Sequence, residues 1–316
     1  MKAAHWNGHH LAFDPAYPTP QADEQTARVH VSLAGICSTD LQIFQGYMGF
    51  SGVPGHEFVG EVTEGPAEWL GQRVVGEINF ACGQCPTCTQ GLGRHCPTRR
   101  VMGILRADGT FAEYVAVPVA NLHPVPDQVT DEAAVFTEPL AAAFEILEQV
   151  HLQPTDNVVI LGDGKLGLLC AQVLHLTGAR VHLVGRHAHK LELLRPHGIR
   201  TILLPDDPPG QADVVVEASG SAEGLQRAIE SVRPRGTLVL KSTVAAAHHL
   251  SLAPLVINEV TVIGSRCGRF SPALHALTHA HVSVTPLIEH IYPLTEASDA
   301  VAHASRRGAL KVLLHP

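Results

Sequence analysis

The sequence has few of the features that would place a protein in a membrane or on a nucleic acid. It contains no run of about 18 apolar residues, so no transmembrane helix is predicted. Its opening, MKAAHWNGHH, lacks the apolar core of a signal peptide. Basic residues number 22 against 30 acidic ones, for a formal net charge of −8, and no long basic block occurs. We therefore expect neither a nucleic acid nor a membrane as a partner, and a reducing cytoplasm as the compartment.

What is present instead is the composition of a globular protein with a substantial core. Of the 316 residues, 45% are hydrophobic and 16% are charged. This length is enough for two domains of ordinary size.

The first 150 residues have the pattern of a β-rich domain. Short apolar runs alternate with glycine and proline turns, as expected for antiparallel strands closing into a barrel. The predicted strands lie in residues 28–37, 57–62, 72–78 and 111–126.

Beyond residue 150 the pattern changes to an alternation of strands and helices. Continuous apolar strands separated by helices predict a parallel sheet that is buried on both faces. The predicted strands are 157–162, 180–185, 201–205, 212–219, 236–242 and 260–265, and helices are expected at 165–179 and 221–233. The last segment, from about residue 267, returns to mixed character.

The segment 130–150 joins the two regions. Thr130 is a plausible helix start, and Pro139 suits the first turn of a second helix. Glu138 then lies at or just before a helix N-terminus. Because glutamate is not a favoured N-cap, a functional reason for it is worth considering.

Four of the seven cysteines fall within fifteen positions. A disulfide cluster, a redox dithiol and a metal site are all possible, but no signal peptide is expected and a dithiol needs only one C-x-x-C pair. Glycine and proline between the cysteines supply turns, so a closed structural zinc site is favoured. A zinc ribbon that binds nucleic acid is opposed by the acidic net charge. The four cysteines are Cys82, Cys85, Cys88 and Cys96.

A second group of possible ligands precedes this loop. Cys37 ends an apolar run, and His56 and Glu57 lie in a Gly/Pro-rich turn before another one. One thiolate, one imidazole and a carboxylate would leave an open position on a zinc ion, as in catalytic sites. Asp40 could orient the histidine, and Thr39 would bring a hydroxyl beside the metal.

The stretch ILGDGKLG, residues 160–167, contains a glycine motif that follows an apolar strand and opens a helix. In that context the motif favours binding of a dinucleotide, with the pyrophosphate at the helix N-terminus. The residues expected to contact the cofactor are Gly162, Gly164, Leu166 and Gly167.

The end of the next predicted strand bears on the choice of cofactor. An enzyme that uses NAD is expected to place an acid there, but this chain has Gly185 followed by Arg186. Arginine suits a 2′-phosphate, and Lys190 could add a second positive charge. We therefore expect NADP(H) to be favoured over NAD(H).

Taken together, these motifs resemble the zinc-dependent medium-chain dehydrogenase/reductase family. GICSTDLQIF, GVPGHEFVGEV, the four-cysteine loop, TEPLA and the glycine-rich turn occur in the family's order along nearly the whole chain. The resemblance implies an α/β protein: a GroES-like β-barrel catalytic domain and a doubly wound Rossmann sheet. We expect the catalytic domain at 1–138, with a zinc lobe at about 82–96, the Rossmann domain at 139–266, and a return to the catalytic domain at 267–316.

The resemblance also assigns roles to residues. Cys37 and His56 become zinc ligands, and Glu57 a variable third one. Glu138, in TEPLA, matches the branch of sorbitol, glucose and threonine dehydrogenases, where this position binds the metal or a water on it. Gln42 departs from the family, because many members have a histidine there that passes a proton to solvent. The proton is then expected to leave through Thr39 and water, or through a carboxylate.

The resulting expectation is a zinc-dependent, NADP(H)-preferring oxidoreductase with two zinc ions per chain. It would transfer hydride between the nicotinamide and a secondary alcohol, polyol or sugar and its carbonyl. By resemblance, Ser242 or Arg266 could contact cofactor or substrate, and a homodimer or homotetramer is expected. The alternatives are an NAD-dependent member of the family, a metal-free reductase of activated double bonds, and a non-catalytic NADP-binding redox sensor.

Overall fold

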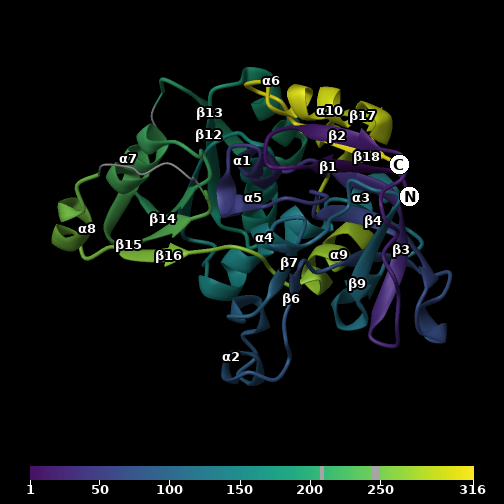
Figure 1. Ribbon diagram of the computed structural model, residues 1–316. Helices are drawn as coiled ribbons and strands as arrows, with labels where there is room; N and C mark the ends of the chain where they lie inside the picture. The colour runs from purple at the N-terminus through teal and green to yellow at the C-terminus, as the bar shows by residue number, and fades with distance from the viewer. Residues whose placement is uncertain (207–209, 244–249) are drawn as a thin grey trace. The chain divides into compact units, whose positions relative to one another are not determined.

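The computed structural model describes residues 1–206, 210–243 and 250–316 (Figure 1). The chain divides into two compact units, which are described separately. Unit 1 comprises Met1–Glu138, Ala273–His279 and Ile288–Pro316, and unit 2 comprises Pro139–Pro272 and Ala280–Leu287. The sequence predicts a return to the first domain at residue 267, whereas unit 2 continues to Pro272. Compactness does not show separate folding, so the predicted domain bounds stay a prediction.

The main sheet of unit 1 is largely antiparallel. Its strands follow the order β10-β5-β4-β3-β18-β17, and β9 also pairs with β3. Only the pairing of β17 with β18 is parallel among the described strands of this sheet. The strands are β3 (Thr26–Gly35), β4 (Glu57–Glu64), β5 (Arg73–Gly76), β9 (Tyr114–Pro118), β10 (Leu122–Pro124), β17 (Ile288–Pro293) and β18 (Lys311–His315).

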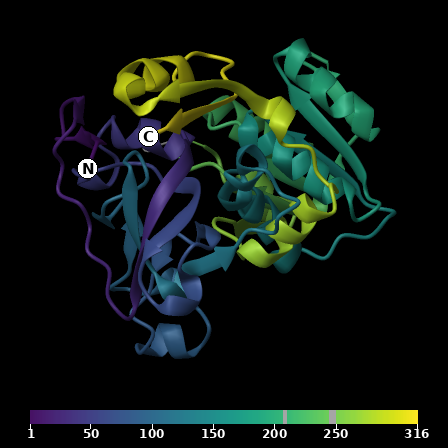
Figure 2. The same ribbon diagram turned by 90° about the vertical axis from the view of Figure 1, so that its right-hand side faces the viewer.

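Strand β3 shows why this sheet forms. Its residues alternate between buried and more exposed positions, with Ala27, Val29 and Val31 inside, which is the period-two pattern of a half-buried strand. Its carboxyl end pairs with β18, so a segment from late in the sequence lies beside one from early in it. Figure 2 shows this yellow C-terminal strand next to the purple N-terminal ones.

Smaller elements complete unit 1. Strands β1 (Ala3–Trp6) and β2 (Leu11–Asp14) pair with each other, and a further small sheet contains β6 (Asn79–Phe80), β7 (Arg100–Met102) and β8 (Arg106–Ala107). The cysteine loop lies between β6 and β7. The helices are α1 (Ser38–Ile43), α2 (Pro86–Thr89), α3 (Asp131–Ala134) and α10 (Ala297–Ala304); α4 (Thr137–Gln149) and α9 (Phe270–Thr278) each have residues in both units.

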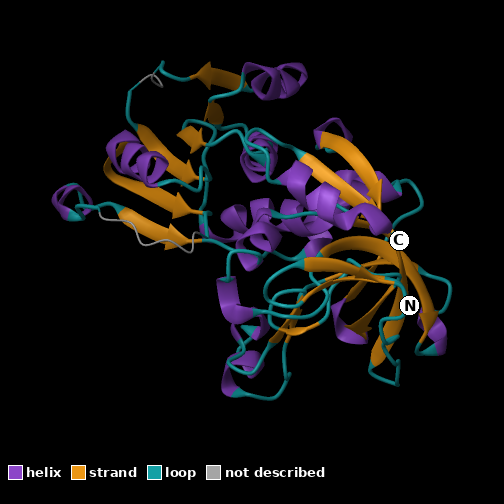
Figure 3. Ribbon diagram, turned by 45° about the horizontal axis from the view of Figure 1, so that its top comes forward, coloured by secondary structure: helices purple, strands orange, loops and turns teal. Residues whose placement is uncertain are grey.

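Unit 2 is built on a parallel sheet. Its strand order, β13-β12-β11-β14-β15-β16, reverses direction between β11 and β14, which is the switch point of a doubly wound sheet. The strands are β11 (Asn157–Leu161), β12 (Arg180–Gly185), β13 (Arg200–Leu203), β14 (Ala212–Glu217), β15 (Val232–Leu240) and β16 (Thr261–Gly264). Figure 3 shows strands of this sheet in orange with purple helices beside them. These helices are α5 (Lys165–His175), α6 (Ala188–Leu191), α7 (Ala222–Ser231) and α8 (Ala253–Ile257).

The core of unit 2 follows from the apolar runs in the sequence. Residues 158–161 of β11 and 214–216 of β14 are buried without alternation, as expected for strands covered on both faces. Helix α5 packs on β11 and β12, and α7 on β14 and β15. No helix in the described part of the chain is both long and apolar enough to cross a membrane.

Candidate metal centres and cofactor site

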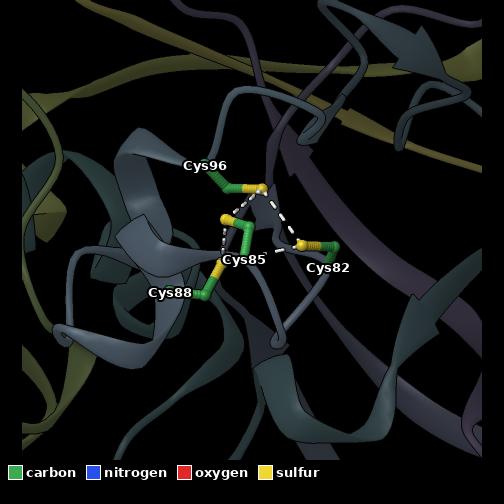
Figure 4. Close-up of side chains that lie close together, drawn as sticks. All are labelled: Cys82, Cys85, Cys88 and Cys96. Atoms are coloured by element: carbon green, nitrogen blue, oxygen red, sulfur yellow. Dashed lines mark hydrogen bonds between the residues drawn. The ribbon is translucent and has the colours of Figure 1, made fainter.

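The four-cysteine loop brings its sulfur atoms together in unit 1 (Figure 4). Four Sγ–Sγ distances are 3.9 Å for Cys82–Cys88, 3.4 Å for Cys85–Cys88, 3.9 Å for Cys85–Cys96 and 3.6 Å for Cys96–Cys82. Disulfide sulfurs lie only about 2 Å apart, and none of the seven cysteines, each in the described part of the chain, forms a disulfide. A tetrahedral zinc ion with four thiolates at about 2.3 Å holds its sulfurs about 3.8 Å apart. The donors therefore fit one zinc ion.

Turns supplied by the sequence close this loop. Gly83 and Gly91 have φ of 75° and 77°, which favours glycine, and Pro86 is the first residue of α2. Backbone hydrogen bonds, the largest from Cys82, lower the pKa of Cys96 to about 6. Burial and the Cys85 thiol raise the pKa of Cys88 to about 12. Thiols this closely packed repel one another when ionised, and a divalent cation relieves that repulsion.

The second cluster also assembles within unit 1. Cys37, His56 and Glu57 offer a sulfur, a ring nitrogen and a carboxylate oxygen that all lie within 4.8 Å of one another. Cys37 is the N-cap of α1, and His56 and Glu57 meet it at the start of β4. His56 and Glu57 are buried, whereas Cys37 is partly exposed. This mixture of donors suits zinc and leaves room for a further ligand.

Asp40 links the parts of this second cluster. Its Oδ2 accepts the Cys37 N–H at 2.8 Å, and its Oδ1 accepts the Gly55 N–H at 3.3 Å and lies 3.2 Å from His56 Nδ1. Burial lowers the pKa of His56, but the charges of Asp40 and Cys37 outweigh it and raise that pKa well above its ordinary value. With Nδ1 facing Asp40, Nε2 is the ring nitrogen available to a metal.

Glu57 lies on the other side of the cluster and is paired with a buried cation. Its Oε2 accepts a hydrogen bond from Lys311 Nζ, and both side chains are at most 1% exposed. Gly35 has no side chain to displace this carboxylate, since a Cβ there would collide with Oε2. Oε1 is buried and has no hydrogen-bond partner among the described residues. A bound cation would satisfy that oxygen, so the site fits a metal.

The remaining residues predicted for this site differ in placement. Thr39 Oγ1 lies 3.8 Å from Cys37 Sγ, so a hydroxyl is beside the cluster. Gln42 lies on α1 and is partly exposed. Glu138 is the second residue of α4 and is partly exposed, but it is not part of either ligand cluster found among the described residues. Its predicted role at the metal stays a prediction. The predicted N-cap Thr130 does accept the Ala133 N–H at 3.3 Å.

In unit 2 the glycine-rich turn has the geometry that a dinucleotide needs. A Cβ on Gly162 would lie 2.6 Å from Ala218 O, and one on Gly167 would collide with Gly162 O, so both glycines allow close packing. A Cβ on Gly164 would meet nothing within 4 Å, which leaves this backbone open to a ligand. Gly164 is the N-cap of α5, and Leu166 lies in its first turn. The turn thus fits a pyrophosphate at a helix N-terminus.

Two basic residues, Arg186 and Lys190, are predicted to bind the 2′-phosphate of NADP(H), and in the structure one is paired and the other is buried. Arg186 is exposed, but its guanidinium pairs with Glu223 of α7 at 2.6 Å. Lys190 is only 3% exposed, so it is not a surface cation in this structure. Sequence reasoning missed Asp163, inside the glycine motif, whose carboxylate contacts Arg186 and His187. The only signal in the sequence was an acid in an otherwise small-residue turn.

Other residues tie the ends of the unit 2 strands together. Ser242 Oγ accepts the Gly220 N–H at 2.9 Å. The buried Lys241 donates to Ala142 O at 2.7 Å, Ser265 Oγ at 3.2 Å and Arg266 O at 3.0 Å. Ser242 and the Arg266 backbone therefore have structural contacts, and their predicted roles toward cofactor or substrate stay predictions.

Fold and site together define a class of protein. A doubly wound sheet with a glycine-rich turn at its switch point binds dinucleotides, and a Cys/His/carboxylate cluster in a β domain suits a catalytic metal. These are the parts of a metal-assisted, dinucleotide-dependent oxidoreductase.

Comparison with known proteins gives the family. Residues 23–127 match the alcohol dehydrogenase GroES-like domain, and residues 166–279 match the zinc-binding dehydrogenase family. A sorbitol dehydrogenase of Halalkalibacterium halodurans is 30% identical over an alignment 341 positions long, gaps included, covering 100% of this chain and 98% of that protein. D-arabinitol dehydrogenase 1 of Uromyces fabae is 28% identical, covering 94% of this chain and 92% of its own. The chain belongs to the zinc-type medium-chain dehydrogenase/reductase family.

Solved structures agree with this assignment. A zinc-binding dehydrogenase from Sinorhizobium meliloti bound to NADP superimposes with a TM-score of 0.90 at 28% identity, covering 100% of this chain and 99% of that one. The rspB protein of Escherichia coli CFT073, in complex with NADH, gives 0.91 at 26% identity with the same coverage. The predicted fold, a GroES-like domain with a Rossmann parallel sheet, is confirmed, as is the prediction of an enzyme of the dehydrogenase class.

Proposed function

We propose that this protein is a zinc-dependent dehydrogenase of polyols, sugars or related secondary alcohols that prefers NADP(H). The observation that carries the proposal is the ligand cluster of Cys37, His56 and Glu57, in a chain that also has an open glycine-rich turn. Relatives named as sorbitol, D-arabinitol and D-arabitol-phosphate dehydrogenases support the substrate class. Relatives named L-threonine 3-dehydrogenase share the chemistry of a secondary alcohol.

The proposed roles of the residues follow from the contacts. When bound, a zinc ion would supply Lewis acidity and a nicotinamide would supply or accept hydride. Cys37 and His56 would hold the ion, with Glu57 Oε1 or Glu138 as the carboxylate ligand. Asp40, whose Oδ1 lies 3.2 Å from His56 Nδ1, would orient the His56 ring.

Proton movement is assigned to a hydroxyl. Thr39 Oγ1 is the side-chain hydroxyl placed next to Cys37 Sγ, at 3.8 Å. Gln42 cannot exchange a proton near neutral pH, so Thr39 would pass the proton to water or to a carboxylate.

The preference for NADP(H) is the finer part of the proposal. It rests on Arg186 and on the absence of an acid at Gly185. The pairing of Arg186 with Glu223 competes with a phosphate, but Glu223 is 79% exposed and can turn away into water. One structural relative was solved with NADP and another with NADH, so relatives alone do not decide the preference.

We also propose a second, structural zinc ion at the four cysteines, and self-association into a homodimer or homotetramer. The support for self-association is the end of the unit 2 sheet. Strand β16 is terminal in the described sheet order, and Val256, Ile257 and Val262 near it are 76%, 77% and 44% exposed. An open strand edge beside apolar side chains is a surface that a second copy would cover.

The decisive experiment is the variant Cys37→Ser, assayed for metal content and turnover. We expect zinc to fall from two ions per chain to one, activity to be lost, and the fold to be kept. Cys267→Ser is the matched control, because Cys267 lies outside both ligand clusters, and it should keep both ions. Full metal content and full turnover in Cys37→Ser would refute the assignment.

A panel of polyols, sugars, secondary alcohols and carbonyls, run with both cofactors, then defines the substrate. Turnover of an activated double bond by metal-free protein would favour the reductase alternative. Tight binding of a cofactor without turnover of any compound would favour the redox sensor.

A further inference from the structure

Asp163 joins the glycine-rich turn to the end of strand β12. Its Oδ2 accepts the backbone N–H groups of Arg186 and His187, both at 2.7 Å, and its carboxylate lies 3.0 Å from His187 Nδ1. Burial raises the pKa of Asp163, but hydrogen bonds from His187 and Arg186 outweigh it and lower that pKa below its ordinary value. An ionised, 7% exposed carboxylate therefore fixes the loop that follows β12.

The same side chain excludes an acid at the end of the strand. A Cβ added to Gly185 would lie 2.5 Å from Asp163 Cβ and 2.6 Å from Asp163 Oδ2. Any larger residue at position 185, including the acid that NAD enzymes use there, would collide with Asp163. The chain thus cannot hold Asp163 in this position together with the usual ribose-binding carboxylate.

The loop held by Asp163 presents donors to its surroundings. The exposed Arg186 carries a guanidinium, and the His187 side chain is 26% exposed, with Nδ1 turned to Asp163. Nε2 is then the ring nitrogen that a ligand can reach. Other ionisable groups nearby are His189, whose ring centroid lies 5.9 Å from that of His187, and Glu223, which pairs with Arg186.

We propose that Asp163 and His187 build the site for the 2′-phosphate of NADP(H), with Arg186 and His187 Nε2 as its ligands and Asp163 as the residue that positions them. The inference rests on the proposed dinucleotide function and adds two residues to its specificity. In the proposed complex the His187 ring donates through Nδ1 to Asp163 and through Nε2 to the phosphate. The Arg186 guanidinium supplies the positive charge opposite the phosphate.

The test measures binding as well as turnover. Calorimetry with NADPH, NADH, adenosine 2′,5′-bisphosphate and AMP is applied to His187→Gln and Asp163→Asn. Loss of one charge-assisted hydrogen bond should weaken the binding of NADPH and of the bisphosphate about tenfold. The affinities for NADH and AMP should change less than about twofold. His189→Gln, an exposed histidine two residues away, is the matched control and should change none of the four.

Two results would overturn the inference. If Asp163→Asn weakens NADH and AMP alone, Asp163 acts as a substitute for the ribose-binding acid. If either variant weakens all four ligands equally, its role is merely structural. Failure of the wild-type protein to bind either dinucleotide would instead refute the proposed function, so the two failures are distinguishable.

A second variant guards against misfolding of Asp163→Asn. Gly185→Asp alone should lose stability because of the collision with Asp163, whereas Asp163→Gly with Gly185→Asp should fold and bind NADH at least about tenfold more tightly than NADPH. A Gly185→Asp protein that is as stable as the wild type would show that Asp163 does not occupy this space.

Discussion

Glu57 and Lys311 form a buried ion pair in unit 1. Neither side chain has contact with bulk water, since they are 0% and 1% exposed. Lys311 Nζ also lies 5.4 Å from the centre of the Phe136 ring, a second favourable contact for the cation. Removing one partner of such a pair leaves the other as an uncompensated buried charge.

In metal-free protein we therefore expect Lys311→Met to lower the free energy of unfolding by about 3 kcal/mol, measured by urea denaturation. Lys2→Met, which breaks the exposed pair with Glu113, is the control and should cost under about 1 kcal/mol. Adding Glu57→Gln to Lys311→Met should recover part of the loss. A loss below 1 kcal/mol in Lys311→Met would show that the Glu57 charge is compensated by another group.

His182 gives a pH dependence to unit 2. It is 5% exposed in β12, and neither ring nitrogen has a hydrogen-bond partner within the described residues. Burial, together with the charge of Arg200, lowers the pKa of His182. The unfolded state, with an ordinary histidine pKa of about 6.5, then binds the proton more readily than the folded state.

Above the unfolded-state pKa, His182 is neutral in both states and its titration does not reduce the stability of the fold. As the pH falls from that pKa through the lower folded-state pKa, that stability is lost, because the unfolded state takes up the proton more readily. The stability of His182→Leu minus that of wild type should therefore be larger at pH 5.5 than at pH 8, as measured by urea midpoints. His9→Gln, at an exposed histidine, should show no such change. An equal difference between His182→Leu and wild type at both pH values would contradict the prediction.

These residues also show which parts of the site could be predicted from the sequence and which could not. The glycine turn, the cysteine spacing and the group of Cys37 with His56 are local patterns with known chemistry, so they could be predicted. Lys311 lies 254 positions from Glu57 in sequence, and no local pattern reports that contact. Asp163 was equally hidden, because its partners lie 23 and 24 positions away.

At the scale of the elements, the cysteine loop between β6 and β7 has little apolar support, because most of residues 81–95 are exposed or partly exposed. Three of its four cysteines are at least partly exposed, and the proposed zinc ion would hold the loop closed where a core does not. We expect Cys96→Ser to lose one zinc ion per chain and to expose residues 82–96 to proteolysis, while NADPH binding persists. Metal analysis and limited proteolysis are the measurements. Unchanged zinc in Cys96→Ser would disprove the structural site.

The predicted strands of unit 2 coincide with the structure to within a few residues, because each is a continuous apolar run with turn residues at both ends. Unit 1 was harder to predict. The insertion of β18 between β3 and β17, with parallel pairing to β17, depends on partners far away in the sequence. The length of β15 was also missed, since the exposed Arg233, Pro234 and Arg235 follow the buried Val232 and interrupt the apolar run.

For the whole molecule, the proposed self-association is testable at the open edge of the unit 2 sheet. We expect the double variant Val256→Asp, Ile257→Asp to sediment with a smaller mass than wild type, because two charges on this surface oppose contact with a second copy. Leu70→Asp, at a 50% exposed leucine of unit 1, is the control and should leave the mass unchanged. The same mass in all three proteins would place any interface elsewhere.

The discontinuous path of unit 1 has a consequence for biosynthesis. Strand β18 carries Lys311, yet it leaves the ribosome only after every residue of unit 2. Until then, β3 lacks its pairing with β18, and Glu57 lacks its ion pair with Lys311. The strands of the unit 2 sheet are contiguous in sequence, so all of them emerge during translation before β18 can complete the surroundings of Glu57.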